Sequence, residues 1–306
     1  MALKGVLSDK NVPAKLAVWL GLILVLTVVT VMIWATCVHS TSVGSMRALQ
    51  AIQTFSVFIL PTLAAVYLWS EMPLSWLRLD HGMSWQLAVL VPLTIIVLAP
   101  GINLLSDWNQ HFSLPSFLAD WEARLQAEEE KMRGLTEMLA QADSVPEWVL
   151  NVVIMALLPA VGEELCFRGT CQGLIESRSD CGTSYGTARL QTRTHVAVWV
   201  TAIIFSGIHF QFYGFVPRML LGAVLGYLLC WTGSLYVPML AHFTNNAIAV
   251  TCYFIAGKGI VRSEVCDSFG TGETAWVGGL SLAVGLALLW LIRRIAVRPQ
   301  SSELPL

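Results

Sequence analysis

Residues 162–169 read GEELCFRG and follow the apolar run VLNVVIMALLPAV, so two adjacent carboxylates and an arginine lie on what reads as a membrane-spanning helix. Glu164 and Arg168 are four residues apart and share one helix face, where they can pair. Glu163 lies about 100° further round the helix and is free to point elsewhere. A charge in lipid costs roughly 3 kcal/mol even on the milder insertion scales. The pattern therefore indicates a wet site in which Glu163 is suited to taking a proton from water.

Two further polar patterns lie on other apolar stretches. FSGIH places Phe205 and His209 four residues apart, and HFTNN places His242 and Asn246 four apart, with Asn245 beside them. A single intramembrane histidine or asparagine is more often a hydrogen-bonding contact between helices. Together with two glutamates, on three separate helices, these residues indicate convergence on one cavity. A carboxylate and two imidazoles can activate water, and an amide can donate to a developing oxyanion, as in the hydrolysis of an amide bond.

The same side chains suit a metal site, because neutral imidazole and carboxylate are ordinary zinc ligands. The ligands would be Glu163, His209 and His242, one from each helix, and the sequence contains no HExxH pattern. Spacing leaves direct general-base catalysis and zinc-assisted hydrolysis both open; we expect no cofactor, with zinc as the alternative. Covalent nucleophiles are less favoured, since Cys166 and Cys171 lie within an apolar helix and Ser206 in FSGIH is a small packing residue.

The composition predicts an all-α, polytopic integral membrane protein surrounded by lipid. Of its 306 residues, 56% are hydrophobic and only 12% are charged, against roughly 25% charged in soluble domains. The net charge of −2, without a dense basic cluster, predicts no nucleic-acid partner. The seven cysteines are odd in number and form no CxxC pair, so neither a disulfide framework nor a zinc knuckle is indicated.

A transmembrane helix needs roughly 20 apolar residues, and eight stretches meet or approach this length. They are 14–38, 48–69, 85–105, 148–172, 195–213, 217–232, 235–256 and 275–293. Seven or nine spans are alternatives, because the fifth and sixth are short and only HFQFYGFVP separates them. The chain then divides into an N-terminal part (1–145) with about three spans, a core (146–256) with all three polar patterns, and a last span with a disordered tail (257–306).

The long connection between the third and fourth spans predicts an amphipathic helix over 116–142. Its apolar residues recur at helical spacing and acidic residues, including Glu128, Glu129 and Glu130, fill the other face. We interpret it as an interfacial helix on the membrane surface, with a substrate lid or docking element as the alternative.

Basic residues near the span ends give the orientation. Three groups fall on one side if there are eight spans: Lys4, Lys10 and Lys15; Arg178, Arg189 and Arg193; Arg293, Arg294 and Arg298. Both termini are therefore predicted to be cytoplasmic.

The three polar patterns match the motifs of one family. EELCFRG resembles the EExxxR motif, FSGIH the FxxxH motif and HFTNN the HxxxN motif of the CAAX prenyl endopeptidase and bacteriocin-processing (CPBP, or ABI) family of intramembrane proteases. The stretch TGSLYVPMLAH is similar to the one that precedes the family's last histidine. The resemblance covers about 145–250, and the order of the motifs along the chain also fits.

This resemblance implies a bundle of about eight transmembrane helices around a conical intramembrane cavity. It also implies that Glu163 is the general base that activates water, assisted by His209, and that His242 and Asn246 stabilise the oxyanion. The family was first described as metalloproteases, and a glutamate mechanism without metal is now favoured for its eukaryotic members.

Supporting roles follow from the same motifs. Glu164 and Arg168 would support the site by pairing, Phe205 belongs to the FxxxH motif, and Asn245 lies near enough to replace Asn246. The compact core and short loops are typical of a bacterial member, which would place the protein in the plasma membrane.

We therefore expect an intramembrane endopeptidase that acts on a membrane-associated peptide or protein. The alternatives are a catalytically silent scaffold or bacteriocin-immunity protein and an ion- or proton-coupled transporter. Against transport, the sequence has no internal repeat and no pair of broken helices in matching positions. A line of polar residues across the whole bundle would favour transport. The sequence leaves the oligomeric state open.

Overall fold

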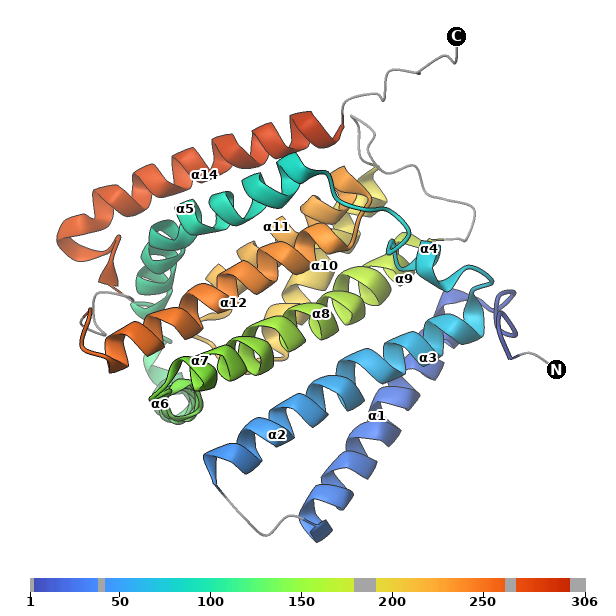
Figure 1. Ribbon diagram of the computed structural model, residues 1–306, viewed down its shortest axis with the longest axis horizontal. Coiled ribbons are helices and arrows are strands. Elements are labelled where there is room, and N and C mark those ends of the chain that lie inside the picture. The colour runs from blue at the N-terminus through green and yellow to red at the C-terminus, as the bar shows by residue number, and fades with distance from the viewer. Residues whose placement is uncertain (1–2, 38–41, 179–190, 262–267, 298–306) are drawn as a thin grey trace.

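A computed structural model describes residues 3–37, 42–178, 191–261 and 268–297. These residues form helices and connecting turns, without a strand among them (Figure 1). The predictions for the C-terminal tail, for Arg189 and for Arg298 fall outside the described residues.

Most of the long helices run in a similar direction in Figure 1, whereas α1 is steeper and α6 is seen nearly end-on. In chain order the elements are α1 Val12–Cys37, α2 Val43–Gln53, η1 Thr54–Ile59, α3 Leu60–Trp69, α4 Pro73–Trp76, α5 Trp85–Gln110, η2 Ser116–Leu118, α6 Ala119–Ala140, α7 Val145–Asn151, η3 Val152–Leu157, α8 Leu158–Glu164, η4 Leu165–Cys171, α9 Gln172–Glu176, α10 Thr192–Gly207, α11 Phe215–Thr232, α12 Tyr236–Gly257, η5 Gly272–Thr274 and α14 Ala275–Ala296. Segments α2 to α3 and α7 to α9 are continuous helices in which η1, η3 and η4 are π-helical.

The polytopic helical bundle predicted from composition is confirmed. Within the described residues six helices are long and apolar enough to cross a membrane: Val12–Cys37, Val43–Trp69, Trp85–Gln110, Val145–Glu176, Phe215–Thr232 and Gly272–Ala296. The predicted count of eight is not confirmed. Helix α10 has only 16 residues, and α12 carries His242, Asn245 and Asn246, which lower its hydropathy.

Three clusters of buried apolar side chains join the helices, and the smallest lies between α10 and α11. Of the two larger clusters, one is built around Trp19, Trp69 and Phe167, and the other includes Leu225 of α11 and Leu289 of α14. The start of α1, the end of α9 and the end of α14 lie at the same end of the bundle, on the right in Figure 1. We call this the α9 end, and the opposite end, where α6 lies, the α6 end.

The helix that carries both glutamates begins with a capping arrangement. Ser144 Oγ accepts a hydrogen bond from the backbone N–H of Glu147, and Glu147 Oε2 accepts one from the backbone N–H of Asp143. Further along, Pro159 has no N–H to offer the preceding turn, and the π-helical segment η3 lies directly before it. The helix ends where Ser177 adopts a left-handed conformation, with φ 53°.

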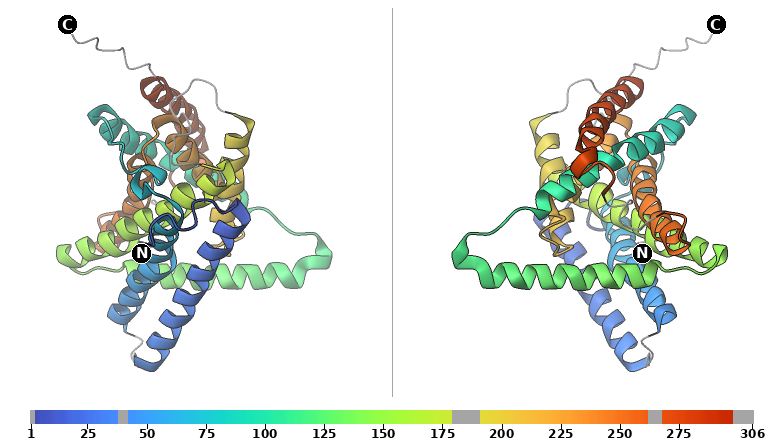
Figure 2. Two further views of the ribbon diagram at one scale, coloured as in Figure 1. Left: turned by 90° about the vertical axis from the view of Figure 1, so that its right-hand side faces the viewer. Right: turned by 90° about the vertical axis from the view of Figure 1, so that its left-hand side faces the viewer.

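Helix α6 lies across the bundle, and its N-terminal part extends beyond the other helices (Figure 2). Arg47 of α2 donates hydrogen bonds to the carbonyl oxygens of Leu139 and Gln141 at its C-terminal end. Nearer its middle, Glu129 Oε2 accepts a hydrogen bond from the backbone N–H of Tyr213, in the turn between α10 and α11. Polar bonds therefore fasten α6 over the α6 end of the bundle.

Helices α5 and α14 pack at close range through small residues. Ser281 Oγ accepts a hydrogen bond from the backbone N–H of Gly101 and donates one to the carbonyl of Val97. A Cβ atom at Gly285 would overlap the Leu98 side chain, whereas one at Gly279 of the same helix would meet nothing within 4 Å. Glycine at 285 thus lets the two backbones approach, as is common between membrane helices.

We expect the Gly285→Val substitution to lower the free energy of unfolding by about 1–3 kcal/mol, because the added atoms force α14 away from Leu98. Denaturant unfolding in mixed micelles measures this change. Gly279→Val is the matched control and should leave the free energy nearly unchanged. Equal losses in both variants would show that close packing of α5 and α14 is not the cause.

Candidate active site

A fully buried ion pair lies at the centre of the bundle. Arg168 Nη1 donates to Glu164 Oε1 at 2.8 Å, and neither side chain is exposed at all. Arg168 Nη2 donates to the carbonyl oxygen of Gly222 on α11, 3.0 Å away. Gly222 is tightly enclosed, since a Cβ atom there would lie 3.3 Å from Arg168 Nη2. The guanidinium therefore bonds the glutamate helix to the backbone of α11.

His242 of α12 lies between the two glutamates. Its Nδ1 is 2.8 Å from Glu164 Oε1, and because a carboxylate only accepts, Nδ1 carries the donated proton. Its Nε2 is 3.8 Å from Glu163 Oε2, which is beyond direct hydrogen-bonding distance. The Glu163 side chain is 14% exposed and that of His242 is 6% exposed. Glu163 and His242 thus face each other across a short gap at the edge of the buried cluster.

Phe205 brings His209 to the same place. Its ring lies 5.3 Å from the His209 ring and 5.8 Å from the His242 ring, both edge to face, and Arg168 stacks over it at 4.4 Å. His209 Nδ1 is 2.8 Å from the carbonyl oxygen of Phe205, so this nitrogen donates and Nε2 of the neutral ring is left as an acceptor. The two histidines therefore meet around one aromatic ring.

The two asparagines lie further along α12. Asn245 Nδ2 donates to Asn246 Oδ1 at 3.2 Å, and Asn245 also lines a cavity. The amide nitrogen of Asn246 donates to no residue that the structure describes. The structure thus brings together Glu163, Glu164, Arg168 and His242 through direct contacts. It adds His209 through Phe205, and it places the asparagines one turn away on the helix of His242.

Two cavities lie at the α6 end. The larger, of about 800 Å³, reaches Asn245, and the smaller, of about 540 Å³, is lined by Arg218 and Gln211. Arg133 of α6 and Tyr253 of α12 line both, so the two cavities adjoin. The linings do not include Glu163, His209 or His242, so among the predicted site residues Asn245 alone lines either cavity.

The segment that holds this cluster is similar to a known protein family. Residues 145–248 match the family model of the type II CAAX prenyl endopeptidase Rce1-like proteins. The resemblance predicted from the three motifs is thereby confirmed for the segment 145–248, here called the Rce1-like segment.

One curated protein matches part of the chain. Over 119 residues the chain is 28% identical to the "Uncharacterized protein YpbD" of Bacillus subtilis (strain 168), a match that covers 38% of this chain. The chain spans about half the length of that relative, since the match covers 50% of it. No solved structure matches the chain.

The residues predicted to bind a metal ion all lie in the Rce1-like segment. In the part of the chain that the structure describes, no three side chains among His, Cys, Asp and Glu are arranged to hold one. Of the predicted ligands Glu163, His209 and His242, only the first and last are in close contact, and Nδ1 of His242 is already bound to Glu164. The predicted zinc set therefore does not fit this arrangement of the described residues.

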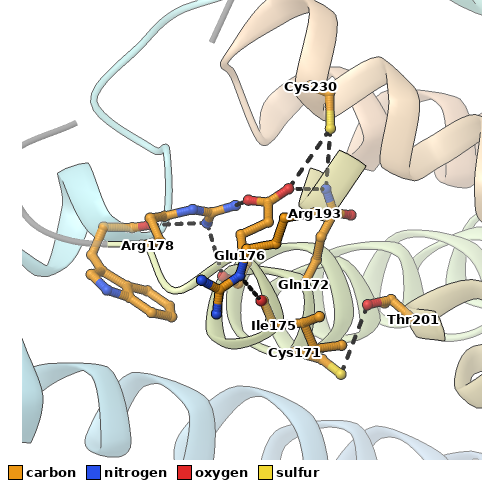
Figure 3. Close-up of polar contacts among 10 residues, drawn as sticks. Cys171, Gln172, Ile175, Glu176, Arg178, Arg193, Thr201 and Cys230 are labelled. Atoms are coloured by element: carbon orange, nitrogen blue, oxygen red, sulfur yellow. Dashed lines mark hydrogen bonds and ion pairs between the residues drawn. The ribbon is translucent and has the colours of Figure 1, made fainter. Parts of the chain in front are cut away.

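Within the Rce1-like segment a second buried polar network lies beyond Arg168, toward the α9 end (Figure 3). Arg178 donates to the carbonyl oxygens of Trp76 and Gly169 and to Glu176 Oε2, and Gln172 donates to Glu176 Oε1. Arg178 was predicted as a basic residue flanking a span, but it is only 6% exposed. Its pairing with Glu176, two residues away, was the available signal.

This network extends the line of polar residues, which is the pattern that transport would require. However, Gln172 is fully buried and Glu176 is 8% exposed, and these side chains bond to each other and to the backbone. The contact of Arg178 with Gly169 also reaches the π-helical segment that contains Arg168. The network is therefore better explained as a set of contacts that hold the C-terminal end of the continuous helix α7 to α9 in place.

We expect Arg168→Met to lower the free energy of unfolding by about 3–5 kcal/mol, because Glu164 would remain buried without its cation. Denaturant unfolding in mixed micelles measures this loss.

The double variant Arg168→Met with Glu164→Gln is the control. It removes both charges and should recover much of the stability. A double variant no more stable than Arg168→Met alone would contradict the assignment of the loss to an unpaired buried carboxylate.

Proposed function

We propose that this protein is an intramembrane endopeptidase that cuts a peptide bond in a membrane-associated peptide or protein. One observation carries the proposal. His242 binds Glu164 through Nδ1 while its Nε2 faces Glu163 Oε2 at 3.8 Å, at the partly exposed edge of an otherwise buried cluster. A fixed imidazole opposite a carboxylate is what activation of water beside a substrate carbonyl requires. The match of 145–248 to the Rce1-like family supports the same activity.

In the proposed reaction Glu163 takes a proton from water as the water oxygen attacks the carbonyl carbon of the scissile bond. His209 assists through Nε2, since its Nδ1 is committed to the Phe205 carbonyl. The proton on Glu163 then passes to the leaving amine as the C–N bond breaks. Glu164 and Arg168 hold His242 in place without touching the substrate.

The developing oxyanion would be stabilised by His242 and Asn246. Because Nδ1 of His242 donates to Glu164, only a protonated ring can also donate through Nε2. Asn246 accepts from Asn245 through Oδ1, which leaves its amide nitrogen for the oxyanion. We retain Asn245 as the replacement, since it lines the larger cavity.

The setting that we propose is a bacterial plasma membrane with both termini in the cytoplasm. The common position of the start of α1 and the end of α14 supports termini on one side (Figure 1). Arg193, Arg293 and Arg294 remain as flanking charges at the α9 end, whereas Arg178 is buried and contributes less to the positive-inside argument. The cavities at the α6 end would then face outward, beneath an interfacial α6.

We expect Glu163→Gln to lower the rate of cleavage by about 10²–10⁴-fold, because it removes the general base while keeping the shape of the side chain. Purified protein in liposomes would be given N-palmitoylated and farnesylated peptides, the latter with a C-terminal CaaX sequence. Mass spectrometry of new peptide ends measures cleavage.

Glu128→Gln, on the exposed face of α6, is the matched control and should cleave like the wild type. Equal cleavage by the Glu163→Gln variant would refute the role of Glu163. A wild type that cuts no peptide would favour the silent scaffold, and proton uptake by the same liposomes that depends on Glu163 would favour transport.

We propose that no metal takes part, and so expect cleavage to persist after treatment with EDTA and with 1,10-phenanthroline. The physical reason is that a carboxylate base with two imidazoles can transfer the protons unaided. The measurement is the rate before and after chelation. Loss of activity that zinc restores would reverse this expectation and point to Glu163, His209 and His242 as ligands.

A further inference from the structure

Arg218, near the start of α11, has a donor without an acceptor. Its Nη2 donates to Gln211 Oε1 at 2.5 Å, but its Nη1 is buried and bonds to no residue that the structure describes. The guanidinium folds back over Gly214, where a Cβ atom would lie 2.9 Å from Nη2. An unsatisfied buried donor on a charged group destabilises a fold. Arg218 Nη1 is therefore available to an acceptor from outside the chain.

This donor lies in the smaller cavity, which adjoins the larger cavity that Asn245 lines. Arg218 lines the cavity of about 540 Å³ together with Gln126, Thr136 and Tyr213. Arg218 lies four residues before Gly222 on α11, so it is about one helix turn from the carbonyl oxygen that accepts from Arg168. A cavity of this size admits the end of a peptide, since ligand pockets range over about 300–1,000 Å³.

The carboxylates already present in the cavity are bound elsewhere. Glu129 acts electrostatically on Arg218, but its Oε2 accepts from the backbone N–H of Tyr213 and, among the described residues, it forms no ion pair with Arg218 within 4.0 Å. Glu130 is paired with Arg133 at 2.8 Å. Arg218 is thus an arginine beside two carboxylates, neither of which binds it.

We propose that Arg218 binds a carboxylate of the substrate peptide and so fixes the peptide against Glu163. Planar guanidinium groups recognise carboxylates through paired, charge-assisted hydrogen bonds, and Nη1 is free to make one of them. The carboxylate belongs either to the C-terminus of the peptide or to an Asp or Glu side chain, and the chemistry of recognition is the same. This inference rests on the proposed function, for which it names a feature of the substrate.

The test measures binding without cleavage, in the full-length Glu163→Gln variant in nanodiscs. Three N-palmitoylated, fluorescein-labelled octapeptides share one neutral sequence. The first ends in a carboxylate, the second in an amide, and the third in an amide with Asp as its penultimate residue. Fluorescence anisotropy should give a Kd about 10- to 100-fold lower for the first or the third than for the second. Whichever of them is preferred identifies the source of the carboxylate.

Adding Arg218→Gln should abolish this preference while leaving the Kd of the amide peptide unchanged. Arg218→Lys should keep part of it, because the charge remains but the paired geometry is lost; this variant carries the test if Arg218→Gln fails to fold. Arg133→Gln, in the same cavity, is the matched control and should keep the full preference.

Three results would overturn the proposal: equal Kd values for all three peptides, including no binding of any; equal weakening of all three by Arg218→Gln; or loss of the preference in Arg133→Gln. Failure of the proposed proteolysis would instead appear as absent cleavage in liposomes, with the preference for a carboxylate intact.

Discussion

The site depends on the burial of one carboxylate. Glu164 is shielded completely from solvent, and an ion in such surroundings loses several kcal/mol of hydration that only close partners can offset. Arg168 and His242 supply those partners, and Arg168 is held in turn by the backbone of Gly222. Because these residues come from three helices, stabilising Glu164 also fixes how α8, α11 and α12 meet. The position of Glu163, one residue earlier, follows from the same contacts.

The two adjacent glutamates differ in exposure, and the different roles proposed for them follow from this difference. Glu164 faces the packed interior, whereas the Glu163 side chain retains 14% exposure at the edge of the cluster. One helix turn thus carries a fully buried carboxylate, Glu164, directly after a partly exposed one, Glu163. Phe205 completes the arrangement, since its ring contacts Arg168 and both histidines.

Sequence patterns predicted which helices carry the site, because EExxxR, FxxxH and HxxxN each put two side chains on one helix face. They also predicted the pairing of Glu164 with Arg168, which depends only on spacing. They could not predict that His242 binds Glu164, since this requires the register between α8 and α12. Arg178 was predicted as a basic residue flanking a span. Its burial could not be predicted, because its acceptors, the carbonyls of Trp76 and Gly169, come together only in the folded chain. The count of eight spans is not confirmed for a related reason: the polar residues of α12 weaken its hydrophobic signal.

The π-helical segment Leu165–Cys171 has a consequence for the length of the chain. A π-helical turn accommodates one residue more than an α-helical turn, so deleting a residue there would return the helix to regular geometry. The side chains on either side of the segment would then keep their relative orientation, because the wide turn had accommodated the extra residue. Deleting a residue from an α-helical turn of the same helix would instead rotate every later side chain by about 100° relative to those before it, and Gln172 would turn away from Glu176's other contacts at the α9 end. A single deletion should therefore be tolerated better within Leu165–Cys171 than in the α-helical parts of this helix.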